Sequence, residues 1–304
     1  MAKSKNLIIV TGPTGSGKTD LSIQLAERLR TEIISADSRQ IYRGIPIGTA
    51  APSAEQTSRI KHHFISTLEL DEYYSAAKYE EEVLPLLNKL WESNNYVVMC
   101  GGSMMYIDAV TNGIDELPTI SDEIRDYAIG LYRDGGLEAL HSKLREIDPE
   151  YLKNCDLNNH RRLIHAIEIT LQAGVPASTL RTGKKKQRDF NILKIAINFP
   201  RAELFERINR RVDEMIANGL EKEAAGVYHL RHLNSLNTVG YKEMFAMMDG
   251  IMDRETAIAR IAKNTRVYAK KQLLWLSKDD NVKYLDPKVP LLDQALAIIS
   301  KFLP

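Results

Sequence analysis

Gly12-Pro13-Thr14-Gly15-Ser16-Gly17-Lys18-Thr19 is the stretch that decides the fold, because it fits the phosphate-loop pattern G-x-x-x-x-G-K-[ST]. Residues 6–10 before it form a short apolar run typical of a buried strand, and residues 20–30 after it place leucines at helical spacing. A strand, a glycine loop and a helix start together form a cradle of backbone N–H groups at the positive end of a helix dipole. These flanks argue against a glycine turn that binds nothing. We therefore expect the loop to hold a polyphosphate such as ATP, with Lys18 on terminal phosphate oxygens and Thr19 on Mg²⁺.

The composition is that of an ordinary soluble globular protein, with 44% hydrophobic and 27% charged residues. At 304 residues the chain is long enough for one large domain or two smaller ones. We see no signal peptide and no long apolar run, so we expect neither export nor a membrane span. Cys100 and Cys155 are too few and too far apart for a disulfide framework or a zinc site. The expected location is the reducing cytoplasm.

Positive charge is unevenly placed, although the net charge is only +1. Residues 181–188 (RTGKKKQR) carry five cations and no acid, and residues 256–278 form a second acid-free stretch. Local basic regions on a near-neutral protein indicate a polyanionic partner at a defined surface. A merely solvated face is the alternative for either run taken alone.

The first third alternates strand and helix, as in a parallel sheet covered by helices. Residues 31–35 are expected to form a second strand, Ser75 to cap a helix running to about residue 94, and residues 96–100 to form a buried strand that ends at two glycines. In such sheets ligands lie beyond the carboxyl ends of the strands. Gly12, Asp37 and Gly101 should therefore surround one crevice.

The middle of the chain changes character, because residues 119–187 look helical, with breaks at 135–136, 149 and 174–176. Residues 191–199 resume strand character, and helices are expected at about 200–218, 221–231 and 253–278. The predicted fold is therefore an α/β, P-loop NTPase-like parallel sheet core, formed by residues 1–118 and 188–304, with an all-helical insertion domain at 119–187.

The helix expected near 258–278 has two faces. Its apolar stripe, which should pack against the core, comprises Ile258, Ile261, Tyr268 and Trp275. The opposite stripe, which could face solvent, phosphate or RNA, comprises Lys263, Arg266 and Lys270.

Asp37 is the first candidate for chemistry, since it follows the second strand and should project over the phosphate site. Its carboxylate could ligate Mg²⁺, cap a turn or accept a proton. The third strand ends in Cys-Gly-Gly-Ser, without the acid that holds Mg²⁺ in ordinary P-loop ATPases. There the glycines would let the strand end approach a ligand and present the Ser103 hydroxyl, or would form a simple turn.

Two further pairs of residues carry chemical groups that can bind phosphate or metal. Arg207 and Arg211 lie four apart on one helix face and could clamp phosphates, or could be ordinary surface ion-pair partners. His62 and His63 have no ligand partner at metal spacing, and we interpret them as structural.

Several segments, in order along nearly the whole chain, resemble the tRNA dimethylallyltransferases, also called tRNA isopentenyltransferases or the IPP transferase family. The segments are the phosphate loop, 37–42 (DSRQIY), 47–50 (IGTA), 101–106 (GGSMMY), 159–162 (NHRR), 207–212 (RINRRV), 237–243 (NTVGYKE) and 268–275 (YAKKQLLW). The phosphate loop is shared with many families, but the ordered set is specific.

This resemblance implies transfer of a dimethylallyl group from dimethylallyl diphosphate to the exocyclic amine of an adenine beside the anticodon of tRNA. The loop would then hold a prenyl diphosphate rather than ATP, which explains the missing acid. Lys18, with Mg²⁺ at Thr19, would stabilise the departing diphosphate, and Asp37 would be the catalytic base, with Ser103 positioning the amine. Arg211 and Arg207 would also contact the diphosphate.

The resemblance also implies that the helical insertion grips the anticodon stem-loop of a tRNA, with the enzyme expected to be a monomer. The implied tRNA contacts are Asp37, Ser38, Arg39, Gln40, Ser103, Arg125, Arg161, Arg162, Leu163, Ile164, His165, Gly240, Tyr241 and Lys271. Ser103 stands where the family usually has Thr, Lys271 replaces an Arg, and Leu274 and Ser277 depart from the usual Thr-Trp-Phe-Arg tail. These departures put local tRNA contacts in doubt and leave the catalytic assignment intact.

Two other functions fit the phosphate loop. A small-molecule or nucleotide kinase would transfer phosphate from ATP, but it gives no role to the helical insertion. An RNA-binding module switched by nucleotide would bind tRNA without prenyl transfer, even after Asp37→Ala.

Overall fold

The computed structural model describes residues 4–303, which form two compact units. The first unit contains the chain up to Thr111 and from Gln187 onward, and the second is Asn112–Lys186. The two connecting segments are tied within the second unit, where Lys186 N–H donates to the Asn112 carbonyl at 2.7 Å and the Thr182 hydroxyl donates to Asp115 at 2.7 Å. The helical unit therefore begins at 112, whereas the sequence pattern placed its start at 119.

The first unit is built on a six-stranded sheet in which every strand pairing is parallel, in the order β3-β2-β4-β1-β5-β6. The strands are β1 (Asn6–Thr11), β2 (Ile33–Ser35), β3 (His62–His63), β4 (Tyr96–Gly101), β5 (Asn191–Ile197) and β6 (Lys283–Leu285). The predicted P-loop NTPase-like α/β core is confirmed. The edge strands β3 and β6 span two and three residues, too short for a sequence period to reveal.

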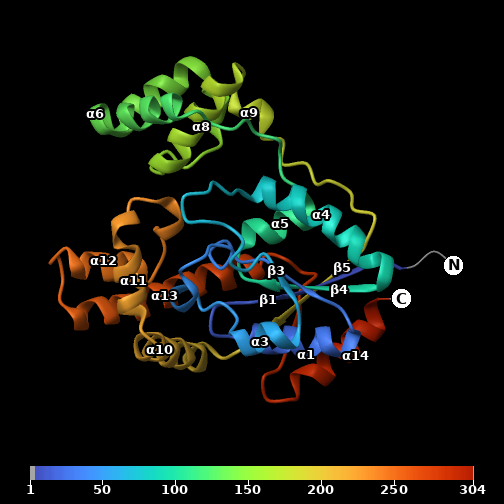
Figure 1. Cartoon of the computed structure of the whole chain (residues 1–304). Helices are drawn as coiled ribbons and strands as arrows, with labels where there is room; N and C mark the ends of the chain where they lie inside the picture. Colours follow the sequence, from blue (N-terminus) through green and yellow to red (C-terminus); the bar gives the residue numbers. More distant parts are fainter. Residues whose placement is uncertain (1–3, 304) are drawn as a thin grey trace. The chain divides into compact units, whose positions relative to one another are not determined.

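Helices cover both faces of this sheet (Figure 1). Helices α1 (Lys18–Leu29) and α14 (Leu291–Phe302) pack on one face, where Ile8 and Val10 point. Helices α4 (Ala76–Ser93) and α5 (Met104–Asn112) pack on the other face, against Leu7 and Ile9. The alternation along β1 gives each face its own apolar core, as expected for a strand buried on both sides.

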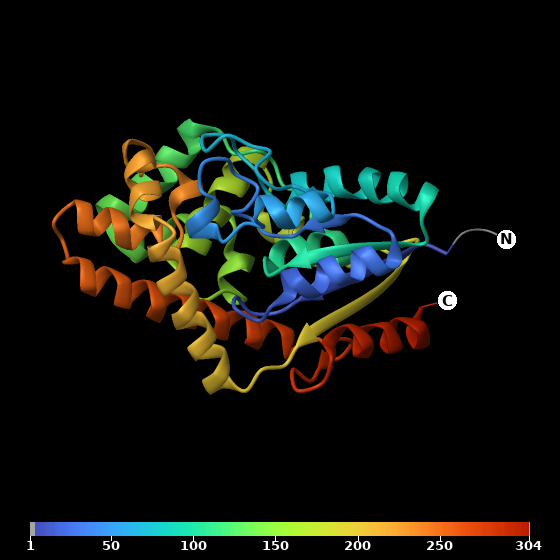
Figure 2. The ribbon, with the colours of Figure 1, turned by 60° about the horizontal axis from the view of Figure 1, so that its bottom comes forward.

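A group of helices lies at the carboxyl ends of the strands (Figure 2). It comprises α10 (Arg201–Ala217), α11 (Leu220–Val227), α12 (Tyr241–Met248) and α13 (Arg254–Leu276). Three of these helices were expected, whereas the sequence analysis did not predict α12. The short elements α2 (Pro46–Thr49), α3 (Ala54–Arg59), η1 (Tyr228–Leu230) and η2 (Asn234–Leu236) complete this end of the unit.

The second unit consists of helices packed around a core of its own. They are α6 (Asp122–Ile147), α7 (Pro149–Lys153), α8 (His160–Ala173) and α9 (Ala177–Leu180). Helix α6 is interrupted at Gly136, whose φ of 62° and ψ of −152° break the helical path, and α8 ends at Gly174 in the left-handed conformation. The predicted breaks are therefore real. Within residues 112–186 no strand is found.

Helix α13 corrects one detail of the predicted two-faced pattern. Ile261 is buried and Trp275 is half-buried, with its indole N–H donating to Asp108 at 3.2 Å, as expected for a packing stripe. Tyr268, however, is 39% exposed. The opposite stripe is partly engaged within the protein, since Arg266 donates to Asn209 and the Lys270 ammonium lies 5.6 Å from the Phe205 ring centroid. Across residues 4–303, no helix combines the length and apolarity needed to span a membrane.

Candidate active site

The phosphate loop connects β1 to α1, where the sequence pattern placed it. Gly15 and Gly17 adopt φ values of 81° and 80°, in the region that residues with a Cβ rarely occupy. Helix α1 begins directly afterwards, at Lys18. Its unpaired N-terminal N–H groups and its dipole favour an anion at this point.

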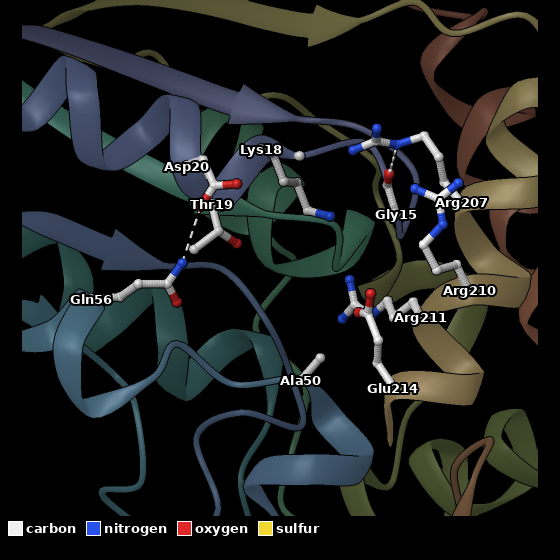
Figure 3. Close-up of a pocket in the computed structure, with 11 residues that line it drawn as sticks. Gly15, Lys18, Thr19, Asp20, Ala50, Gln56, Arg207, Arg210, Arg211 and Glu214 are labelled. Atoms are coloured by element: carbon white, nitrogen blue, oxygen red, sulfur yellow. Dashed lines mark hydrogen bonds between the residues drawn. The ribbon is translucent and has the colours of Figure 1, made fainter. Parts of the chain in front are cut away.

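A cavity of about 390 Å³ opens beside this loop (Figure 3). Its lining comes from the loop, the start of α1, residues near α2 and α3, and one face of α10. The lining residues are Gly15, Gly17, Lys18, Thr19, Asp20, Ala50, Gln56, Arg207, Arg210, Arg211 and Glu214. Four cationic side chains face two acidic ones, so the cavity has the charge required to hold a polyphosphate.

The electrostatics of the cavity also favour an anion. Burial lowers the pKa of Lys18, and the nearby Arg211 lowers it further, while Cys100 and Asp37 act in the opposite direction. Burial likewise lowers the pKa of Arg211, against the attraction of Asp37 and Glu214. Both cations pay a desolvation cost that a bound anion would offset.

The loop also contains an orphaned hydroxyl. In the part of the chain that the structure describes, Ser16 Oγ is the only buried side-chain nitrogen or oxygen without a hydrogen-bond partner. Buried polar atoms are nearly always paired, and an unpaired one often marks the place of an ion or ligand. Its place inside the phosphate loop agrees with a bound phosphate oxygen there.

Asp37 follows β2 at the edge of the same crevice and has a structural role as well. Its Oδ1 accepts the backbone N–H groups of Arg39 at 2.9 Å and Gln40 at 3.2 Å, which fixes the turn after the strand. The same carboxylate acts through space on Lys18 and Arg211. The capping role weighed from sequence is thus present, and it uses one carboxylate oxygen.

Ser103 joins the ends of β2 and β4. Its Oγ accepts the Ser38 N–H at 2.9 Å and donates to the Ser38 hydroxyl at 3.2 Å, while its own N–H donates to the Ala36 carbonyl. The glycines before it serve this contact, because a Cβ on Gly101 would lie 2.1 Å from the Ala36 oxygen. Of the two roles left open for these glycines, Gly101 therefore has the structural one, since protein atoms fill the space beside it.

A family assignment follows from sequence comparison. The sequence model described as IPP transferase matches residues 40–279, more than three quarters of the chain. The chain belongs to the IPP transferase family. Its relatives include tRNA dimethylallyltransferase 1 of Bacteroides fragilis, 49% identical over 285 residues, covering 94% of this chain and 95% of the relative. The enzyme of the same name from Phocaeicola vulgatus is 50% identical over 281 residues, covering 92% and 94%.

Solved structures agree with this assignment. The full-length tRNA isopentenylpyrophosphate transferase of Bacillus halodurans is 34% identical, with a TM-score of 0.71, covering 98% of this chain and 95% of that one. A eukaryotic dimethylallyltransferase, captured acting on tRNA, superimposes with a TM-score of 0.81 over 98% of this chain and 79% of its own. At 24% identity it supports the shared fold alone.

In this IPP transferase, several residues expected to contact tRNA have partners inside the first unit. The Arg39 guanidinium donates to the Asn234 carbonyl at 2.7 Å, and the Gln40 amide donates to the Thr49 and Ala50 carbonyls. Tyr241 requires a correction. Its side chain is fully buried and its hydroxyl donates to the Glu223 carboxylate, so the side chain belongs to the protein core.

Gly240 and Lys271 are the other two residues of this unit that were expected to contact tRNA. Gly240 precedes α12 with a φ of 101°, and its N–H donates to the Glu243 carboxylate at 2.8 Å. Lys271 is exposed on α13.

In the helical unit, the expected contacts divide into exposed and buried side chains. Arg161, Arg162 and His165 are exposed on α8, and Arg125 on α6 is partly exposed. Leu163 is fully buried in the core of this unit, which corrects its assignment as a tRNA contact, and Ile164 packs beside that core.

The basic run at 181–188 also has structural members. In the first unit, Arg188 pairs with Glu80 at 2.7 Å, and both side chains are at most 10% exposed. In the helical unit, the Arg181 guanidinium lies 5.5 Å from the Tyr151 ring centroid. The polyanion contact proposed from this run therefore rests mainly on Lys184 and Lys185, which are exposed.

His62 and His63 lie on the edge strand β3. The first bonds the Ile60 carbonyl through Nδ1 at 2.8 Å, and the second pairs with Glu32. No group of three or more His, Cys, Asp or Glu side chains suited to a metal occurs among residues 4–303.

Sequence reasoning missed three residues of the site: Arg210, Gln56 and Gln272. Arg210 lines the cavity one position before Arg211, and its signal was the Arg-Arg pair within RINRRV. Gln56 also lines the cavity and donates to Asp20 at 3.0 Å. Gln272 joins two loops of the site, and its signal was its place in the family segment at 268–275 (YAKKQLLW).

Proposed function

We propose that this chain transfers the dimethylallyl group of dimethylallyl diphosphate to the N6 amine of the adenine adjacent to the anticodon in tRNA, releasing diphosphate. The observation that carries the proposal is the nearly full-length identity of about 50% to enzymes named tRNA dimethylallyltransferase. The cationic cavity beside Asp37 supports it, since it offers a diphosphate grip and a carboxylate at one edge of the sheet.

The leaving-group half of the reaction is assigned to the cavity. As the C1–O bond of the substrate breaks, its electron pair moves to the diphosphate, and negative charge grows on the phosphate oxygens. Lys18, Arg211 and Arg210 line the cavity and would stabilise that charge. Because these cations are held in place before the reaction, little reorganisation is needed in the transition state.

The acceptor half is assigned to Asp37. The N6 lone pair forms the new bond to C1 of the allylic group, and N6 loses one proton to the Asp37 carboxylate. The Oδ1 bonds to Arg39 and Gln40 N–H groups hold this carboxylate in orientation. The Ser103 hydroxyl fixes the neighbouring Ser38, which keeps the turn that carries the base in place.

Mg²⁺ fits the residues of the cavity. This ion keeps several waters and commonly binds substrate phosphates together with one or two protein oxygens. The Thr19 hydroxyl at the start of α1 is the proposed protein ligand, and the orphaned Ser16 Oγ marks the loop as a place for phosphate oxygens. When bound, the ion would neutralise part of the diphosphate charge.

The helical unit is proposed to bind the anticodon stem-loop through Arg125, Arg161, Arg162 and His165. The target adenine must leave its stack to reach Asp37, which costs a few kcal/mol that contacts to the flanking nucleotides offset. Binding through such cations should weaken as salt rises. We further propose that the enzyme acts as a monomer in the cytoplasm, where its tRNA substrate is found.

The test incubates the purified protein with dimethylallyl diphosphate, Mg²⁺ and unmodified tRNA, then digests the tRNA and measures prenylated adenosine by mass spectrometry. We expect product with the wild type and a loss of about 10²- to 10⁴-fold in Asp37→Ala. Asp280→Ala, which removes an exposed acid, is the matched control and should retain activity. Absence of product with the wild type would refute the transferase, and full activity in Asp37→Ala would refute the base.

The same assay separates the alternatives. A kinase would transfer phosphate from ATP in the absence of dimethylallyl diphosphate. A nucleotide-switched RNA-binding module would bind tRNA and give no prenylated product. Neither alternative is favoured by the family to which the chain belongs.

A further inference from the structure

Gln272 on α13 bridges two loops of the site. Its Oε1 accepts the backbone N–H of Thr14 in the phosphate loop at 3.0 Å, and its Nε2 donates to the Gly102 carbonyl after β4 at 2.9 Å. The side chain is 3% exposed. One buried amide therefore joins segments that lie 258 and 170 residues away in the sequence.

The orientation of the Gln272 amide is fixed by its two partners. Thr14 supplies a donor and Gly102 an acceptor, so a flipped amide would face donor with donor and acceptor with acceptor. A Cβ on residue 102 would lie 2.2 Å from Gln272 Nε2 and 3.2 Å from the Gly12 carbonyl oxygen. Gly102 is thus the residue that leaves room for the amide.

The bridge continues from Gly102 to the proposed base. The next residue is Ser103, whose Oγ holds the Ser38 N–H and whose N–H holds the Ala36 carbonyl. Asp37 lies between these two anchored residues. Hydrogen bonds of ordinary length, together with the peptide link from Gly102 to Ser103, therefore connect the phosphate loop, through Gln272, to the turn that carries Asp37.

The occupied Thr14 amide has a second consequence. In a phosphate loop the backbone N–H groups are the usual phosphate donors. Here the Thr14 N–H donates to Gln272, so this amide fixes the loop to α13 and does not bind the anion.

We propose that Gln272 is a positioning residue that sets the spacing between the phosphate loop and the turn that carries Asp37, the proposed base. This inference rests on the proposed prenyl transfer for its catalytic meaning. In a displacement reaction both reacting atoms must lie within near-attack distance, and a misplacement of about 1 Å can cost about 10²-fold in rate. Loss of the bridge should therefore slow the chemical step while each half of the site still binds its own substrate.

The variants separate these effects. Gln272→Met keeps an unbranched side chain of similar volume and loses both bonds. We expect its single-turnover rate of prenyl transfer to fall about 10- to 100-fold, with dissociation constants for dimethylallyl diphosphate and tRNA changed less than about threefold. Gln294→Met is the matched control, because Gln294 likewise joins a backbone N–H and carbonyl, those of Asp286, on α14. Its rate should equal that of the wild type.

Gln272→Glu provides a rescue. A protonated carboxyl can accept from Thr14 and donate to Gly102, as the amide does, whereas the ionised form places a charged oxygen against the Gly102 carbonyl. Burial at this position disfavours the charged carboxylate and raises the pKa of the introduced acid. The rate of Gln272→Glu relative to the wild type should therefore rise as pH falls, while the ratio for Gln272→Met stays flat. If Gln272→Met fails to fold, this pH response decides the question.

A second readout is independent of the reaction. Hydrogen exchange of the Thr14 amide should be faster in Gln272→Met than in the wild type, with no substrate present. A wild-type single-turnover rate in Gln272→Met, or an intact rate with weakened diphosphate binding alone, would overturn the proposal. So would unchanged Thr14 exchange or a flat pH ratio for Gln272→Glu. If the wild type gives no product, the proposed function fails separately, and the exchange measurement still tests the bridge.

Discussion

Arg207 Nε donates to the Gly15 carbonyl oxygen at 2.8 Å, so this arginine holds the phosphate loop in place (Figure 3). Its guanidinium also lies over the Phe199 ring, 4.6 Å from the ring centroid, which adds a cation–π contact. Arg211, one helical turn further on, is half-buried and lines the cavity with Lys18. The two arginines that looked equivalent on one helix face therefore differ in their roles.

This difference predicts opposite effects on the stability of the free enzyme. Arg207→Met should lower its melting temperature by several degrees, because the loop loses an anchor worth about 1–2 kcal/mol. Arg211→Met should leave it unchanged or raise it, since a half-buried cation with a lowered pKa is removed. Arg211→Met should also lose about 10²- to 10³-fold in kcat/KM for dimethylallyl diphosphate. Thermal unfolding of the free enzyme measures the stability of the two variants, and the prenyl-transfer assay measures their kcat/KM. Equal destabilisation by the two variants would contradict the assignment.

Arg210 should contribute to diphosphate binding, although less than Arg211. It lines the cavity but is exposed, so water and salt screen its charge. We expect Arg210→Ala to weaken binding of inorganic diphosphate about three- to tenfold at low salt, and the difference to shrink at high salt. Arg201→Ala on the same helix is the control, since that guanidinium lies over the Phe205 ring at 5.2 Å. Titration calorimetry at two salt concentrations gives the comparison, and an effect independent of salt would argue against a charge contact.

Local patterns were enough to predict the sheet core and the phosphate loop. The buried strand β1, the glycines after it and the leucines of α1 each follow a short-range rule. Gln272 could not be found in this way, because its importance lies in two backbone groups far away in sequence. Tyr241 and Leu163 were misassigned for a related reason: a motif shows that a residue matters, but only packing shows whether its side chain faces a ligand or the core.

The lowered pKa of Lys18 predicts a pH effect on diphosphate binding. Burial is the main cause of the lowering, and Arg211 adds to it. The ammonium should therefore lose its proton at a pH below its ordinary value of 10.5, and affinity for diphosphate should begin to fall there. Lys18→Arg keeps its charge throughout this range. Ionisation of diphosphate affects both proteins alike, so the wild-type affinity relative to Lys18→Arg should fall in a binding titration as pH rises toward 10.5. A constant ratio over that range would show that Lys18 keeps its proton.

The ion pair of Lys194 and Asp279 should make the first unit sensitive to acid. Lys194 is 8% exposed on β5, and its ammonium lies 2.7 Å from Asp279 and 5.7 Å from the Trp275 ring centroid. Burial opposes ionisation of Asp279, but hydrogen bonds from Lys194 and Asn281 outweigh it, and its pKa is lowered from 3.8. A lowered carboxyl pKa stabilises the folded state above the unfolded value, and this stabilisation is lost as pH falls through the folded value.

Asp279→Asn should therefore destabilise the protein by about 2–4 kcal/mol at pH 7, because it leaves the Lys194 charge buried without its partner. The difference from the wild type should shrink below about pH 3.8, as Asp279 itself becomes protonated. Urea unfolding from pH 7 to pH 3 measures this difference, with Asp280→Asn as the neighbouring exposed control. Adding Lys194→Met to Asp279→Asn should recover part of the loss, because the buried charge is removed. A double variant no more stable than Asp279→Asn would show that the cost arises from lost packing rather than from the unpaired ammonium.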